Sequence, residues 1–163
     1  LILLAKNPYS SCILSEAVKD HAVHREYAAV VSGKTDDSGT IDLPIARKDG
    51  STIERVCDPE RGEAAVTHYQ TIAYNKDADL SFIRLLLETG RTHQIRVHMA
   101  WRSHPILGDT VYGHKKPELG QSSQCLHARE LTFVHPRTGE RMTVRCELPD
   151  YFTALLEKLR ARA

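Results

Sequence analysis

Residues 85–109 read LLLETGRTHQIRVHMAWRSHPILGD, an apolar run followed at once by arginines, histidines and a glutamine. Apolar residues alternate before Gly90, which predicts a β-strand over residues 80–88 that ends near that glycine. Beyond the glycine they recur at helical spacing, which predicts a helix over residues 92–103 with Thr92 as its N-cap. The side chains expected in the core are Ile83, Leu85 and Leu87 from the strand and Ile95 and Met99 from the helix.

The polar side chains at this junction are candidates for binding a ligand. Arg91, His93, Gln94 and Arg96 fall within six residues where the strand gives way to the helix, and they supply more hydrogen-bond donors than helix capping needs. Guanidinium groups beside a helix N-terminus favour a phosphate or a carboxylate. The junction therefore predicts an anion-binding site.

Three further polar residues of the stretch have a structural interpretation. His98, His104 and Asp109 are expected to satisfy backbone groups, and HPILGD predicts a turn in which Asp109 bonds to its own backbone. A metal site formed by His93, His98 and His104 is the weaker alternative, because His93 and His98 are five residues apart with no carboxylate between them.

The rest of the chain predicts an α+β fold with a mixed, largely antiparallel sheet flanked by helices. Residues 34–63 are rich in Gly, Asp, Thr and charge and predict a β-rich insertion. Other segments alternate as strands or repeat at helical spacing. The expected strands are residues 1–6, 26–33, 64–74, 126–134 and 141–148, and the expected helices are residues 9–21 and a closing helix marked by Phe152, Leu155, Leu156 and Leu159.

Composition limits the class of protein. With 163 residues, 41% hydrophobic content and 26% charged content, we expect one soluble domain over residues 1–163, truncated at its N-terminus because the chain starts with Leu. The opening LILLA is too short for a signal peptide, and the four cysteines form no CxxC pair or dense framework, which favours the cytoplasm. The net charge of +1 argues against a tail-driven nucleic-acid binder but permits a local basic surface.

The sequence also resembles a known family. ETGRTHQIRVHMA followed by HPILGD is similar to the signature of the RluA-type pseudouridine synthases, which isomerise uridine in ribosomal or transfer RNA. The resemblance continues through LILLAKN, VKDHAVHREYAAVVSG, LHARELTFVHPRTGE and ELPDYFTALLEKL, and so covers nearly the whole chain. It implies the pseudouridine synthase fold and an RNA partner, and it implies no cofactor, no metal, no membrane and no obligatory protein partner.

The resemblance assigns roles to particular residues. In the family an aspartate is the nucleophile, the arginine of HQIR pairs with it, and the tyrosine of a basic-x-Tyr-x-Ala element stacks on the flipped uracil. Here these elements give Arg96 and Tyr27, and Leu126 matches an apolar residue of the base pocket. Tyr27 and Arg96 are therefore expected to line one cleft. The remaining candidates for contacts with RNA are Arg91, His93, Gln94, Lys115 and Lys116.

One element of the family pattern is missing. The nucleophilic aspartate belongs to a His-Arg-Leu-Asp-x-x-Thr-Ser-Gly element ahead of the segment that matches LILLAK, and no aspartate here has that context. We therefore expect the 163-residue chain alone to be inactive, with Arg96 facing an open cleft. A non-catalytic RNA-binding module and, less favoured, a histidine-based metal hydrolase are the alternatives.

Overall fold

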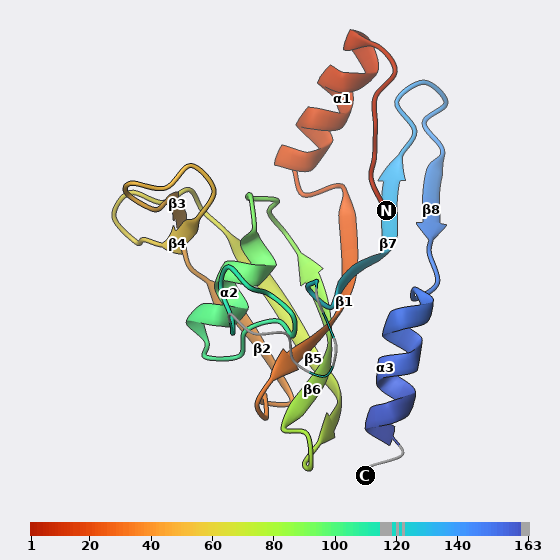
Figure 1. Cartoon of the computed structure of the whole chain (residues 1–163). Coiled ribbons are helices and arrows are strands. Elements are labelled where there is room, and N and C mark those ends of the chain that lie inside the picture. Colours follow the sequence, from red (N-terminus) through yellow and green to blue (C-terminus); the bar gives the residue numbers. More distant parts are fainter. Residues whose placement is uncertain (115–118, 120, 122, 161–163) are drawn as a thin grey trace.

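A six-stranded antiparallel sheet organises this computed structural model, which describes residues 1–114, 119, 121 and 123–160 (Figure 1). The strand order is β2-β5-β6-β1-β7-β8. The strands are β1 (His24–Ser32), β2 (Ser38–Asp42), β5 (Val66–Asn75), β6 (Leu80–Leu87), β7 (Leu126–Val134) and β8 (Arg141–Arg145). A separate two-stranded ladder holds β3 (Ile45–Arg47) and β4 (Arg55–Cys57), and the helices are α1 (Pro8–Lys19), α2 (Gln94–Trp101) and α3 (Asp150–Arg160). The predicted fold class is confirmed.

Strand β6 lies between β5 and β1 and follows the predicted alternation. Ile83, Leu85 and Leu87 are buried on the face that packs against Ile95 and Met99 of α2, in one core cluster. The other face packs against α3, where a second core cluster joins the following residues: Ala28, Val30, Leu80, Phe152 and Leu155. Helices α2 and α3 therefore cover opposite faces of the sheet.

Helix α1 forms as the helical spacing predicted, and it packs near one end of the sheet. Asn7 is its N-cap and accepts a hydrogen bond from the backbone N–H of Ser10, and Pro8 occupies the first turn, where a missing N–H does no harm. Leu14 of this helix packs against Leu131 and Phe133 of β7. These apolar contacts place α1 beside β7.

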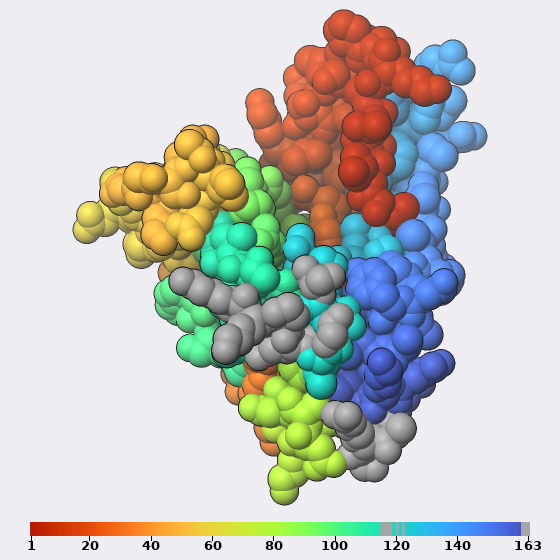
Figure 2. Space-filling view, in the orientation of Figure 1, coloured from red at the N-terminus to blue at the C-terminus, as the bar shows by residue number. Residues whose placement is uncertain are grey.

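Residues 34–63 divide between two ladders. Strand β2 extends the main sheet by pairing with β5, whereas β3 and β4 pair with each other. Ile45 packs against Val97 of α2 in a small apolar cluster with Ala65. In Figure 2 the segment that holds β3 and β4 forms a lobe beside the body of the sheet. Whether this segment is an insertion remains a prediction.

Two sequence-based expectations are wrong. Residues 1–6, expected as a strand, form none: among the described residues, the bond that joins their backbone to the sheet runs from the N-terminal amine of Leu1 to the carbonyl of Ala128, and a strand needs a continuous ladder. Thr92 is not the N-cap of α2. His93 takes that position in a left-handed conformation at φ 58°, without a side-chain capping bond.

The alternation of β6 gives a stability prediction. Ile83→Ala should lower the free energy of unfolding by about 2–5 kcal/mol, because it removes buried apolar contacts below α2 and leaves a cavity. Leu86→Ala on the same strand is the matched control, since Leu86 is 40% exposed. Urea unfolding checks both variants, and equal losses would show that β6 does not have the burial pattern described.

Candidate functional site

The junction between β6 and α2 is held together by Gln94. Its side-chain oxygen accepts hydrogen bonds from Thr89 Oγ1 at 2.8 Å and from the backbone N–H of Arg91 at 2.9 Å. Its amide nitrogen donates to the carbonyl of Val66 at 2.9 Å and to Thr67 Oγ1 at 3.0 Å. These bonds use the full hydrogen-bonding capacity of a buried amide. The structure therefore places Gln94 as a link between strands and not, as expected, as a group facing a ligand.

Arg96 and Asp109 form a buried, bidentate ion pair. Arg96 donates from Nε at 2.7 Å and from Nη2 at 2.8 Å to the two carboxylate oxygens. Asp109 also accepts from the backbone N–H groups of Val111 and Tyr112, which confirms the predicted turn. The expectation that Arg96 faces an open cleft without a partner is wrong, because Asp109 fills that role.

The ion pair changes the acidity of both partners. Burial alone would raise the pKa of Asp109, but the hydrogen bonds from Arg96 and from two backbone N–H groups hold that pKa below its usual value. The same pairing raises the pKa of Arg96. The guanidinium also lies over the ring of Tyr112, 4.9 Å from its centroid, which adds a cation–π contact.

His93 connects the start of α2 to the β3–β4 ladder. Its Nδ1 lies 2.8 Å from the hydroxyl of Tyr112, which accepts a hydrogen bond from the backbone N–H of Arg55. Burial, reinforced by the positive charges of Arg96 and Arg55, lowers the pKa of His93. A neutral imidazole is therefore expected at pH 7.

Arg91 belongs to a shallow depression of about 370 Å³ that is rich in arginine. Its Nε donates to the carbonyl of Ala64 at 2.9 Å, and its Nη1 pairs with Glu63. We call this the arginine depression; it is lined by Ile45, Ala46, Arg47, Arg55, Arg61, Glu63, Gly90, Arg91 and Thr92. The depression groups Arg91 with three other arginines, and the contact of Arg91 with phosphate stays a prediction.

Tyr27 lies at a different hollow, a cavity of about 570 Å³ between α1, the N-terminal segment, β1 and β7. Its walls are mostly aliphatic, including Leu14, Val18 and Val23, while Arg25 contributes a guanidinium. We call this the Tyr27 cavity. Burial raises the pKa of Tyr27, although the charge of Arg25 opposes the shift, so the phenol stays protonated at pH 7.

Only some of the predicted site residues come together. Leu126 packs against the same core cluster as Tyr27. Arg96 is not among the residues that line the Tyr27 cavity, so the cavity brings Tyr27 together with Arg25 instead. Arg25 was missed, although the spacing RxY on one strand places both side chains on one face. Lys115 and Lys116 lie outside the described residues.

His98 and His104 have structural partners, as predicted. His98 is buried, with Nδ1 2.9 Å from Thr67 Oγ1 and Nε2 2.9 Å from the carbonyl of Leu43. His104 Nδ1 lies 2.9 Å from the carbonyl of Ser32. Among the described residues, no three His, Cys, Asp or Glu side chains converge as metal ligands. Within the same part of the chain, no helix has the length and apolar character needed to cross a membrane.

Comparison with known proteins gives consistent relatives. A family model described as RNA pseudouridylate synthase matches residues 1–101. An uncharacterized RNA pseudouridine synthase of Bacillus subtilis (strain 168) is 44% identical over 158 residues, which covers 96% of this chain and 54% of the relative. A ribosomal large subunit pseudouridine synthase D of Zymomonas mobilis is 38% identical over 98% of this chain and 52% of its own length. The chain thus spans about half the length of these relatives.

Solved structures show the same fold. Human RNA pseudouridylate synthase domain containing 4 aligns with a TM-score of 0.74 at 24% identity, over 94% of this chain and 69% of that one. Human RNA pseudouridylate synthase domain containing 1 aligns with a TM-score of 0.69, over 96% of this chain and 74% of that one.

The Arg96–Asp109 pair gives a prediction on stability. Asp109→Asn should lower the free energy of unfolding by about 3 kcal/mol at pH 7, because it leaves a guanidinium that is largely shielded from water without its counter-ion. Asp36→Asn is the matched control, since Asp36 pairs with Arg102 in an exposed ion pair. Urea unfolding measures both, and a loss no larger than the control's would contradict the assigned role of the pair.

The same pair predicts a pH dependence. Because the folded-state pKa of Asp109 is lowered, its stabilisation is complete above the unfolded pKa of about 3.9 and is lost as pH falls through the folded value. The stability difference between the unaltered chain and Asp109→Asn should therefore be constant near neutral pH and shrink in acid. A difference that grew as pH fell would mean that the pKa is shifted in the other direction.

Proposed function

The chain belongs to the RNA pseudouridylate synthase family, and on that premise we propose that the protein containing it isomerises uridine to pseudouridine in RNA. The observation that carries the proposal is the family match over residues 1–101, which includes both Tyr27 and Arg96. The relatives named as ribosomal large subunit synthases favour ribosomal RNA as the first substrate to test, ahead of transfer RNA. A cytoplasmic location is part of the proposal.

The Tyr27 cavity suits a base taken out of its stack. Enzymes that act on a base inside RNA extrude the nucleotide and hold the base in a pocket with aromatic and apolar walls. The cavity offers the ring of Tyr27 and a largely aliphatic lining in about 570 Å³. Tyr27 supplies the stacking surface, since its raised pKa keeps the phenol neutral.

The reaction breaks the C1′–N1 bond of uridine, turns the base and joins C1′ to C5, which requires a nucleophile. We assign this role to no carboxylate of the described residues. Asp109 is committed to Arg96 and to two backbone N–H groups, which lowers both its basicity and its access to substrate. The nucleophile in the proposal is the aspartate that the family resemblance implies, supplied from outside the 163 residues.

Arg96 retains a place in this proposal. Its bonds to Asp109 use Nε and Nη2 and leave Nη1 outside the pair. An arginine whose direction is fixed by one carboxylate can hold a second carboxylate with its remaining donor, and its charge keeps the second one ionised. Arg96 is thus proposed to position the nucleophile, with Asp109 fixing Arg96.

Turnover tests the function. The 163-residue chain should bind uridine-containing RNA without releasing tritium from 5-tritiated uridine, while a full-length protein that carries the family's aspartate element should release it from ribosomal RNA. Mapping of the modified position then identifies the substrate. Equal rates for the two proteins would show that the nucleophile lies within the chain, and no release by either would leave the non-catalytic RNA-binding module as the function.

Tyr27 gives a sharper prediction. Tyr27→Ala should weaken binding of a uridine-containing oligonucleotide by about tenfold to a hundredfold, since stacking of one base contributes about 1–3 kcal/mol. Tyr9→Ala removes an exposed tyrosine from the surface of α1 and is the control. Fluorescence anisotropy measures both. Equal affinities of the two variants would remove Tyr27 from the proposed base pocket.

The arginine depression is proposed to contact the RNA backbone. Arg91→Gln should lower affinity at low salt and reduce the slope of log K against log salt by about 0.7 if one phosphate contact to single-stranded RNA is lost. Arg137→Gln, on the turn between β7 and β8, removes an exposed charge elsewhere and is the control. An unchanged slope for Arg91→Gln would place the RNA backbone away from this depression.

A further inference from the structure

Arg25 has two buried donor nitrogens without a partner among the described residues. It lies on β1 between Leu87 of β6 and Leu131 of β7, two residues before Tyr27. Its Nε and Nη2 are buried, and neither has a hydrogen-bond partner among the described residues. These two nitrogens form the same edge that Arg96 presents to Asp109. Arg25 thus offers a second bidentate fork, here without an anion.

The junction leaves space for this side chain. Gly90 follows β6, and a Cβ atom added there would overlap Nη1 of Arg25. Any other residue at position 90 would therefore push the guanidinium away from its place. The glycine of the TGR motif therefore leaves room for Arg25, which also lines the Tyr27 cavity.

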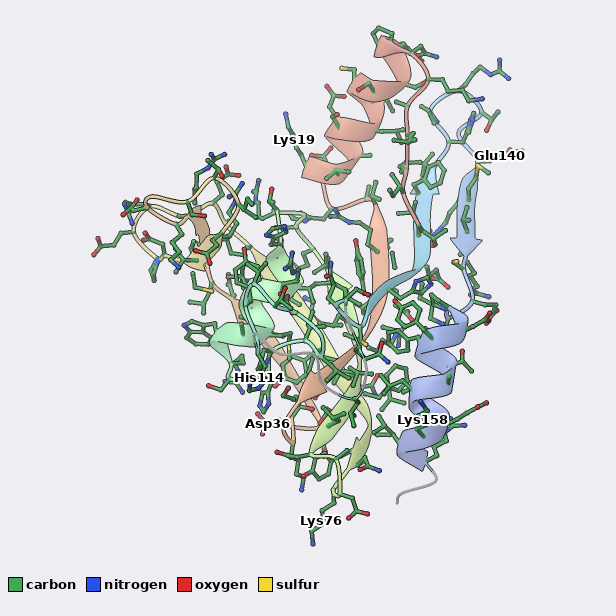
Figure 3. All side chains as sticks on the ribbon, in the orientation of Figure 1. Lys19, Asp36, Lys76, His114, Glu140 and Lys158 are labelled. Atoms are coloured by element: carbon green, nitrogen blue, oxygen red, sulfur yellow. The ribbon has the colours of Figure 1, made fainter. Side chains whose placement is uncertain are left out.

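Two carboxylates close to Arg25, one in the cavity wall and one next to it on β1, pair with other arginines. Glu130 lines the same cavity, but it accepts a hydrogen bond from Arg145 Nε at 2.6 Å. Glu26, the next residue of β1, pairs with Arg84. Lys19, labelled at the end of α1 in Figure 3, adds a second positive charge to the cavity wall. Excess positive charge in an apolar enclosure favours an anionic ligand.

Two buried donors without acceptors lower the stability of the fold, because each has lost its hydrogen bonds to water. The edge of a guanidinium that carries them matches two oxygens of a phosphate with short, charge-assisted hydrogen bonds. Arg25 and Tyr27 lie two apart on β1, which places both side chains on one face of the strand, and both line the same cavity.

We propose that Arg25 binds the phosphate of the nucleotide whose base stacks on Tyr27. This inference rests on the proposed function and names the part of the substrate that the cavity recognises besides uracil. Both nitrogens are closed to bulk water in this conformation, so the proposal requires the Arg25 side chain to turn its edge toward the cavity when the phosphate binds. Desolvation of the edge strengthens the ion pair once it forms.

Uridine and uridine 5′-monophosphate separate the two contributions to binding. The unaltered chain should bind the monophosphate at least about tenfold more tightly than uridine, because a charge-assisted hydrogen bond contributes about 1.5–3 kcal/mol. Inorganic phosphate should compete with the monophosphate and not with uridine. Titrations followed by NMR of the labelled chain measure all three.

Variants assign the preference to Arg25. Arg25→Met should bind both ligands with affinities within about twofold of each other and should melt at the same or a higher temperature, since it removes two buried donors that have no acceptor. Arg25→Lys keeps the charge but loses the fork, and should retain part of the preference. Arg102→Met removes an arginine that pairs with Asp36 and does not line the Tyr27 cavity, and it should keep the full preference.

The outcomes are distinct. If the unaltered chain binds uridine and its monophosphate equally, or if Arg25→Met keeps the preference, the inference is overturned while the proposed function stands. If neither ligand binds near Tyr27, both the inference and the proposed base pocket fail. A fall in melting temperature for Arg25→Met with an unchanged preference would assign Arg25 a structural role.

Discussion

The ion pair between Arg96 and Asp109 is the constraint on which the site depends. It joins α2 to the turn that follows it, and the same turn places Tyr112 against both His93 and the backbone of Arg55. Because both charges are largely removed from water, each needs the other, and the pair fixes the direction of Arg96 before any substrate arrives. A prearranged guanidinium of this kind suits a site in which a carboxylate must be held ionised.

Gln94 extends that constraint to the sheet. Its amide joins β5 to the β6–α2 junction, and Thr67 passes the connection on to His98, whose other ring nitrogen reaches the carbonyl of Leu43. This buried chain of hydrogen bonds ties α2 to the sheet. Most polar residues of the signature therefore hold the site in place and do not face a ligand. The groups that can contact a ligand lie at the edges of the site, in the Tyr27 cavity and the arginine depression.

Much of the fold could be predicted from periodicity. The alternation in β6 and the spacing of Ile95 and Met99 have their expected structures, because burial on one face imposes a period of 2 or 3.6. The strand expected over residues 1–6 does not form, because an apolar run predicts burial but does not predict a neighbouring strand to pair with. Thr92 is not the N-cap, because the side chain of Gln94 in α2 already accepts hydrogen bonds from Thr89 Oγ1 and from the backbone N–H of Arg91.

The site was harder to predict, because its pairing is long-range. The turn at Asp109 is a local feature and was predicted, whereas the partnership of Asp109 with Arg96 depends on how α2 folds back. Arg25 gave no local signal besides its place in the RxY element. Its importance shows only in the structure, where Gly90, just beyond the end of β6, packs against its guanidinium. Packing across strands decides which arginines are paired and which are available.

The most direct measurement of the central claim is a nuclear Overhauser contact between the H6 proton of uracil and the ring protons of Tyr27, with uridine 5′-monophosphate bound to the chain carrying labelled tyrosine. The account predicts contacts from H6 to Tyr27 and none to Tyr112, which lies beside the Arg96–Asp109 pair. Contacts to Tyr112 in place of Tyr27 would contradict it and move the base pocket to the junction between β6 and α2.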